Sequence, residues 1–346
     1  MSRRRHHLEI LARRVGCFSA AGFRLLIGLA IGLLVVAPPR QIFAADAGLV
    51  DARTEIHFAY SKSMFVDVNE NDAKAAIKVY AMNIGDQNGV YVDSQPDLPD
   101  GTNAIAKLLE MKKADMLVLT AEEFFALENQ GLEGPLMLAK VQESCTEKYL
   151  LLSSADGAIH AVEDLKGRSL NLAYDARNSL AVVWLDMLCR EHGLGPASGA
   201  LAKITRNSKI TQVVLPVFFG KADACIVTHD SWEVMCELNP QLKKQLNVLA
   251  VSAPLVATVT CFRHGFTEEF KQKVIKAVDL SSLRPEFKQL MAMFKTEGLV
   301  SQPLSALAGT RAFMASYHQL CAGTNDARTV AFETSRPSSE TERKGK

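Results

Sequence analysis

Short apolar segments alternate with amphipathic segments along most of the chain, and this alternation limits the folds that the sequence can adopt. Residues 55–60 and 114–120 have the length and composition of strands, whereas apolar residues in 71–84 recur every three or four positions, which is typical of a helix. Strands separated by helices call for a parallel sheet covered on both faces. We therefore predict an α/β fold with mainly parallel sheets flanked by helices.

The alternation occurs twice, which predicts two lobes. Longer apolar strands at 148–154 and 256–265 bracket the second set. The chain would cross between the lobes near 143–148 and 251–256, and 267–320 would be helices packed on the first lobe. The predicted boundaries are 53–145 with 253–320 for the first lobe, 146–252 for the second lobe, and 321–346 for a polar, disordered tail.

The N-terminus has the three-part pattern of a secretory signal peptide. Residues 1–24 carry six arginines and one acidic residue, residues 25–37 carry no charge, and small residues suited to cleavage follow. The uncharged run is short for a membrane span, which needs roughly 20 residues. We expect 1–44 to be a signal peptide cleaved after Ala44, which would place the protein in the periplasm. Cleavage after Ala47, or an uncleaved membrane anchor, is the alternative.

Charge and motifs exclude several functional classes. The chain has 39 basic and 38 acidic residues; residues 1–44 hold seven and one of these, so 32 and 37 remain. A net negative mature chain argues against nucleic-acid binding and means that any anion site must be local. The sequence has no phosphate-binding glycine loop, no Gly-x-Ser-x-Gly elbow and no Cys–His spacing typical of zinc. We therefore expect no enzyme activity, no cofactor and no metal.

Polar residues gather where predicted strands end and the next helices begin. Ligands bind at the carboxyl ends of strands in open α/β sheets. Helix N-termini add unpaired N–H groups and a positive dipole end, which suit anions. The candidate ligand-binding residues are Tyr60, Ser61, Lys62, Ser63, Thr120, Arg177, Asn178, Ser179, Ser208, Lys209, Thr228, His229 and Asp230.

These candidates also have structural interpretations, which stay open at this point. Ser179 and Ser208 would serve as N-caps of the helices that follow them, and Asp230 would cap the next helix in the chain. Lys62 would be a solvated surface lysine, and Tyr60 would belong to the core. The clustering of polar residues at strand ends is a stronger argument than any one of them.

The order of several segments resembles a known family. The segments are FAYSKSMF, KKADMLVLT, KYLLLSSADGAIHAVEDLKGRSL, LPVFFGKADACIVTHDSWEVM and SAPLVATVTCFRHGFTEEFKQKVIKAV, and the most telling parts are D-L-K-G and G-K-A-D-A. Together they resemble the phosphate/phosphite/phosphonate substrate-binding proteins of ABC importers, over about residues 55 to 320. Many family members carry a Ser-Thr-Ser type cluster for the phosphonate oxygens. The matching segment here offers Asn178 and Ser179, with Arg177 as a compensating charge.

The resemblance implies a type II periplasmic binding protein fold, in which two lobes hinged by two crossover segments close over a ligand. The ligand would be a small oxyanion or a phosphonate-like compound, bound by a monomer and delivered to the membrane permease of an ABC importer. A ligand-sensing protein that signals to a membrane histidine kinase is the alternative with the same fold.

Overall fold

The computed structural model describes residues 55–322, except 67, 89–90 and 94. The predicted signal peptide, its cleavage site, and residues 323–346 of the predicted tail lie outside the described residues. Within the described part, no helix has both the length and the apolar character needed to cross a membrane. Two five-stranded sheets, each with helices on both faces, form the framework of this part of the chain.

The first sheet has the strand order β12-β5-β11-β4-β2. Its strands are β2 (Phe58–Tyr60), β4 (Met116–Thr120), β5 (Leu132–Lys140), β11 (Thr258–Arg263) and β12 (Gly298–Gln302). Only β2 and β4 pair in parallel; β11 pairs antiparallel with β4 and β5, and β12 pairs antiparallel with β5. The mainly parallel pairing predicted for this sheet is therefore wrong, because β11 and β12 return late in the chain and run against the earlier strands.

The second sheet has the order β10-β6-β9-β7-β8. Its strands are β6 (Tyr149–Ser154), β7 (Ser169–Ala173), β8 (Lys203–Asn207), β9 (Ala224–Thr228) and β10 (Leu246–Val251). The strand β7 pairs in parallel with β8 and β9, whereas β6 pairs antiparallel with β9 and β10. This sheet is mixed as well, because β6 enters it from the opposite end.

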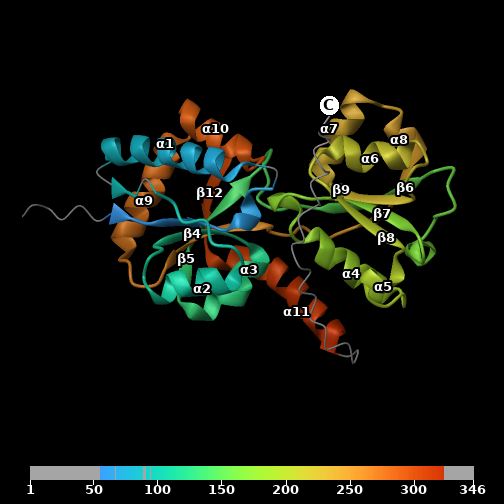
Figure 1. Cartoon of the computed structure of the whole chain (residues 1–346), viewed down its shortest axis with the longest axis horizontal. Coiled ribbons are helices and arrows are strands. Elements are labelled where there is room, and N and C mark those ends of the chain that lie inside the picture. Colours follow the sequence, from blue (N-terminus) through green and yellow to red (C-terminus); the bar gives the residue numbers. More distant parts are fainter. Residues whose placement is uncertain (1–54, 67, 89–90, 94, 323–346) are drawn as a thin grey trace, which may run out of the picture. The chain divides into compact units, whose positions relative to one another are not determined.

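Helices cover both faces of the first sheet and bury a separate apolar core on each face (Figure 1). On one face lie α1 (Glu70–Asn88), α9 (Glu268–Ser281) and α10 (Pro285–Met293). On the other face lie α2 (Thr102–Glu110) and α3 (Ala121–Leu127). The apolar residues of β4 are buried at every position, as expected for a strand between two covered faces.

The second sheet is built in the same way (Figure 1). The helices α6 (Ile210–Phe218), α7 (His229–Leu238) and α8 (Leu242–Gln245) cover one face, and α4 (Ala181–Glu191) and α5 (Ala197–Ala200) cover the other. Trp184 of α4 lies in the core, 5% exposed, beside Tyr149 of β6. Trp184 therefore contributes to the core of the second sheet.

Two chain segments run between the sheets and pair with each other. Glu147 and Leu255 exchange backbone hydrogen bonds of 2.7 and 2.9 Å, one from each of the two predicted crossover segments. The last helix, α11 (Ala308–Ala322), follows β12 of the first sheet yet packs on α4 of the second. The segment predicted to be wholly helical thus contains a strand, β12, and its last helix contacts the second core.

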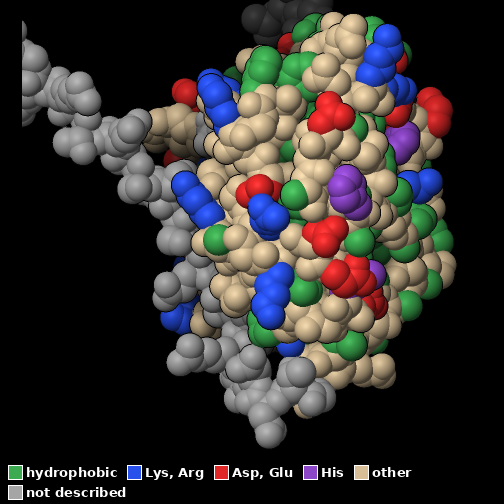
Figure 2. All heavy atoms as spheres, turned by 90° about the vertical axis from the view of Figure 1, so that its right-hand side faces the viewer, with side chains coloured by type: hydrophobic (Ala, Val, Ile, Leu, Met, Phe, Trp, Pro, Cys, Tyr) green, Lys and Arg blue, Asp and Glu red, His purple; other side chains and the backbone are tan. Residues whose placement is uncertain are grey.

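The remaining elements are short. They are β1 (Glu55–Ile56), β3 (Tyr91–Val92), and the 3-10 segments η1 (Lys62–Met64), η2 (Glu128–Gln130), η3 (Val162–Leu165), η4 (Ala176–Asn178) and η5 (Leu304–Leu307). Figure 2 shows one face of the molecule, on which basic and acidic side chains are interspersed. That face carries no broad field of one sign.

Candidate functional site

The candidates of the first sheet follow the carboxyl ends of β2 and β4. Ser61 comes directly after β2 and caps η1, where its hydroxyl accepts a hydrogen bond from the Ser63 N–H at 3.2 Å. Thr120 is the last residue of β4 and caps α3. Tyr60 lies apart from them, because its ring is 4% exposed and stacks on Phe294 in the core, with 6.0 Å between centroids. Tyr60 thus belongs to the core, as its structural interpretation predicted.

A buried carboxylate joins these hydroxyl groups. The Glu123 Oε1 atom accepts hydrogen bonds from Ser61 Oγ at 2.6 Å and from Ser63 Oγ at 3.0 Å. The other oxygen, Oε2, accepts from the Thr120 N–H at 2.9 Å, and the Thr120 hydroxyl accepts from the Glu123 N–H at 3.3 Å. The sequence analysis missed Glu123, although the Thr-x-x-Glu spacing of a capping box was visible in it.

An open cleft of about 900 Å³ lies beside this group of residues. One wall comes from the η1 segment and the start of α1, and the other comes from the ends of β7 and β8 with the start of α6. Three candidates line the cleft: Lys62, Ser63 and Ser208. The sequence analysis missed other polar lining residues, notably Tyr174, Arg206, Asn207 and Gln212.

Each wall of the cleft contributes a basic group. Lys62 Nζ lies 3.8 Å from a Glu70 carboxylate oxygen and 3.7 Å from an Asp100 oxygen. On the opposite wall, the Arg206 guanidinium lies over the Tyr174 ring, 5.3 Å from its centroid, in a cation–π contact. The cleft therefore combines two cations with two carboxylates, and it suits a ligand that carries an oxyanion together with other polar groups.

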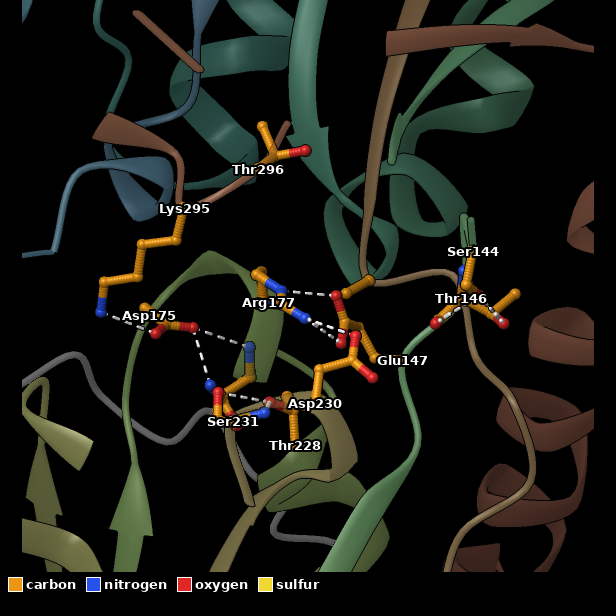
Figure 3. Close-up of polar contacts among 12 residues, drawn as sticks. Ser144, Thr146, Glu147, Asp175, Arg177, Thr228, Asp230, Ser231, Lys295 and Thr296 are labelled. Atoms are coloured by element: carbon orange, nitrogen blue, oxygen red, sulfur yellow. Dashed lines mark hydrogen bonds and ion pairs between the residues drawn. The ribbon is translucent and has the colours of Figure 1, made fainter. Parts of the chain in front are cut away.

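Arg177 belongs to a separate cluster of charges that does not line the cleft (Figure 3). Its guanidinium donates to both Glu147 oxygens, at 2.6 and 2.8 Å, and to an Asp230 oxygen at 3.3 Å. The two short parallel bonds to Glu147 have the bidentate geometry of a strong ion pair. The guanidinium is thus already engaged by the chain itself, and its predicted contact with an anionic ligand stays a prediction.

This cluster contains more carboxylates than cations. Asp175 Oδ2 accepts a 2.8 Å bond from Lys295 Nζ, which also donates to the Ser208 carbonyl at 3.0 Å. Burial raises the pKa of the Glu147 carboxyl. Arg177 acts to lower this pKa, whereas the negative charges of Asp230 and Asp175 raise it further. Two cations thus face three carboxylates, a balance that disfavours a further anion at Arg177.

The other second-sheet candidates next to η4 are held by the chain. The Asn178 side-chain amide donates to Asp175 Oδ1 at 2.7 Å, whereas its own Oδ1 atom is buried without a hydrogen-bond partner in the described structure. The Ser179 hydroxyl donates to the Ala257 carbonyl at 3.1 Å. Ser179 is not the N-cap of α4, a position that Leu180 occupies without a side-chain bond. The N-cap alternative for Ser179 is therefore wrong, because its hydroxyl bonds to the residue directly before β11 instead.

The candidates at the starts of α6 and α7 include caps and exposed side chains. Thr228, not Asp230, caps α7, because its hydroxyl accepts from the Ser231 N–H at 3.4 Å. His229 is half exposed, and its ring lies 3.6 Å from Asp230. Lys209 is exposed and occupies the N-cap position of α6 without a side-chain bond, so the N-cap alternative for Ser208 is wrong as well.

Most of the predicted residues therefore fall into three groups. The first group comprises the hydroxyl-bearing residues around Glu123, of which Ser63 lines the cleft. The second is the charge cluster around Arg177, and the third comprises Lys62 and Ser208 on the cleft walls. Within the described ranges, no group of three or more His, Cys, Asp or Glu residues is placed to hold a metal ion. Whether any of these residues contacts a ligand stays a prediction.

The chain matches a family of periplasmic solute-binding proteins. The family model "ABC transporter, phosphonate, periplasmic substrate-binding protein" matches residues 64–305. Because this match spans more than half of the sequence, the chain belongs to the family of periplasmic phosphonate substrate-binding proteins of ABC transporters. Members are periplasmic binding proteins, and they work with a permease in the membrane. No curated protein matches the sequence.

Several solved structures share the fold at low sequence identity. XAC2383 from Xanthomonas citri, solved bound to ATP, has a TM-score of 0.55 at 14% identity over 78% of this chain and 98% of that chain. A binding component of a phosphonate transporter from Pseudomonas aeruginosa has a TM-score of 0.53 at 14% identity over 81% and 92%. PhnD1 from Prochlorococcus marinus, in complex with methylphosphonate, has 0.50 at 12% identity over 77% and 98%. These likenesses confirm the predicted α/β class and type II periplasmic binding protein fold.

Proposed function

We propose that this protein captures an organic oxyanion, such as a phosphonate, in the cleft between Lys62 and Arg206 and delivers it to the permease of an ABC importer. The observation that carries this proposal is the placement of one basic group on each wall of the same cleft. A ligand that contacts both groups would draw the walls together. Such contacts are how hinge closure of two lobes is driven in binding proteins.

The size and chemistry of the cleft favour an organic ligand over an inorganic anion. At about 900 Å³, the cleft is at the upper end of the range of small-molecule sites. Inorganic phosphate would leave most of this volume to water. The amide groups of Asn207 and Gln212 and the hydroxyl of Tyr174 offer hydrogen bonds to parts of a ligand beyond the oxyanion.

A thermal-shift screen of the purified protein tests this function. The ligands are methylphosphonate, phenylphosphonate, inorganic phosphate and sulfate. We expect an organic phosphonate to stabilise the protein more than phosphate or sulfate does. A ligand at 100 times its Kd adds about 2.7 kcal/mol to the free energy of unfolding. The proposal fails if no phosphonate changes the melting temperature.

A pair of variants ties the binding to the cleft. Arg206→Gln removes the cation of the second wall and should weaken phosphonate binding by at least tenfold, since one charge-assisted contact is worth about 1.5–3 kcal/mol. Lys203→Gln removes an exposed cation from the other end of the same strand, β8, and should leave binding unchanged.

The sensor role remains the alternative, and loss of phosphonate uptake in cells that lack the protein would favour the importer.

A further inference from the structure

Glu123 is bound by the chain in the way that a protein binds an oxyanion. Its carboxylate accepts three hydrogen bonds of 2.6, 3.0 and 2.9 Å, from two hydroxyl groups and one backbone N–H. The residue is only 7% exposed, and Ser61 is fully buried. In the part of the chain that the structure describes, no Lys, Arg or His forms an ion pair with Glu123. Neutral donors alone therefore satisfy this carboxylate.

The capping of α3 explains only part of this arrangement. A capping box needs one bond from the Thr120 N–H to Glu123 and one bond back, and Oε2 makes the first of these. The second oxygen, Oε1, is bound by Ser61 and Ser63, which belong to the segment after β2, about 60 residues earlier in the chain. These two hydroxyls are not part of the cap, yet both converge on one oxygen.

The donor group adjoins the cleft. Ser63 lines the cleft and also donates its hydroxyl to Glu123, so one residue belongs to both places. Lys62, the neighbouring residue, is one of the two basic groups on the cleft walls. Of the three donors only Ser63 lines the cleft, so Ser63 is the point at which a ligand in the cleft would approach this donor group.

We propose that Ser61, Ser63 and the Thr120 N–H form an oxyanion site that Glu123 keeps occupied, and that Glu123 thereby determines which ligands the cleft accepts. This inference rests on the proposed function, in which the cleft captures the ligand for transport. The oxyanion of the ligand is directed away from these hydroxyls and towards Lys62 and Arg206. Small inorganic oxyanions, which would depend on such a compact site, are disfavoured.

The test is to vacate the site and supply an anion. Glu123→Ala removes the carboxylate and the carbon before it, which are the atoms that acetate would restore. We expect acetate and phosphite each to raise the melting temperature of Glu123→Ala more than that of the wild type. The rise should be about 2–4 °C for each kcal/mol by which the anion stabilises the variant. Acetamide, an uncharged molecule of the same shape as acetate, should give no rise.

Matched variants separate an oxyanion site from a helix cap. Glu110→Ala removes an exposed acidic residue from the end of the neighbouring helix α2 and should gain nothing from either anion. Ser61→Ala in the Glu123→Ala background should abolish the gain. A gain with acetate but not with phosphite would mean that the site fits only a capping carboxylate, and no gain with either would also overturn the proposal.

Poor folding of Glu123→Ala does not remove the test. If the variant accumulates as folded protein only when acetate or phosphite is present during purification, the site is supported; if neither anion restores it, the proposal is overturned. The outcome is independent of ligand capture in the cleft. Binding of phenylphosphonate to the wild type is measured without this variant, and failure of either experiment leaves the other result standing.

Discussion

Asp164 and Asp223 belong to the two short motifs that most resemble the family, and both act by holding a turn. An oxygen of Asp164 accepts from the N–H groups of His160 and Ala161 at 2.9 and 3.0 Å. An oxygen of Asp223 accepts from the Ser169 N–H at 2.8 Å and from its hydroxyl at 2.6 Å. The Asp164 bonds hold the start of η3, and the Asp223 bonds fix the chain where strands β7 and β9 begin. The motifs therefore report on the fold, and they carry no information about the ligand.

Asp223→Asn should lower stability in a pH-dependent way. The Ser169 hydrogen bonds hold the pKa of the Asp223 carboxyl below its ordinary value. A depressed pKa gives stability that is present above the unfolded pKa of about 3.9 and is lost as the pH falls through the folded value. We expect a cost of about 1 kcal/mol at pH 7, since the carboxylate is partly exposed.

Urea unfolding at pH 7 and at about pH 3 measures this effect. The difference between wild type and Asp223→Asn should shrink at the lower pH. Asp156→Asn, at an exposed carboxylate, serves as the control and should have little effect at either pH. A difference that is equal at the two pH values would contradict the assignment.

The residue scale is also where the sequence analysis reached its limit. It identified Ser61, Ser63, Thr120 and Arg177 because hydroxyls and cations after strands are visible in the sequence. It could not identify which carboxylates engage them, because Glu147 reaches Arg177 across 30 residues and Glu123 reaches Ser61 across 62. Such partners depend on tertiary contacts.

Arg177→Met should destabilise the protein strongly. The side chains of Arg177 and Glu147 are 12% and 11% exposed, so the change leaves a buried carboxylate without its partner. We expect a loss of about 3 kcal/mol in the free energy of unfolding. Adding Glu147→Gln should recover part of this loss, because the unpaired charge is then gone. Additive costs in the double variant, measured by urea unfolding, would show that the two residues are not coupled.

At the scale of elements, most helices and the apolar strands were predictable, whereas the strands β5 and β8 were not. The segment that forms β5 contains Gly134 and Pro135, which argue against a strand in the sequence, yet it pairs with β11 and β12. The edge strand β8 has the sequence KITRN, which is mostly polar because only one side of it is paired. Both strands are defined by their neighbours more than by their own composition.

The helix α11 ties the two sheets together, and its contacts give a third stability prediction. The Tyr317 hydroxyl donates to the buried Asp186 carboxylate of α4 at 3.0 Å. Tyr317→Phe removes this bond and should cost about 1.5 kcal/mol, as expected for a hydrogen bond to a charged group. Gln319→Ala, at an exposed position of the same helix, is the control. Equal melting temperatures for Tyr317→Phe and the wild type would contradict this role of α11.

At the scale of the whole molecule, the sequence predicted two α/β units and two crossover segments. The second sheet uses residues 149–251 and the first uses residues before and after them, and Glu147 and Leu255 pair where the crossovers were expected. The precise boundaries of the two lobes remain a prediction. The cleft was not foreseen in detail, because Lys62 and Arg206 are brought to the same cavity only by the packing of the two units.

The central claim is that this cleft binds an organic oxyanion through Lys62 and Arg206. The most direct test is isothermal titration of phenylphosphonate into the wild-type protein and into Arg206→Gln, with Lys203→Gln as the control. Our account predicts saturable binding to the wild type and the control, and affinity at least tenfold weaker for Arg206→Gln. Equal affinity for all three proteins, or no binding to the wild type, would contradict it.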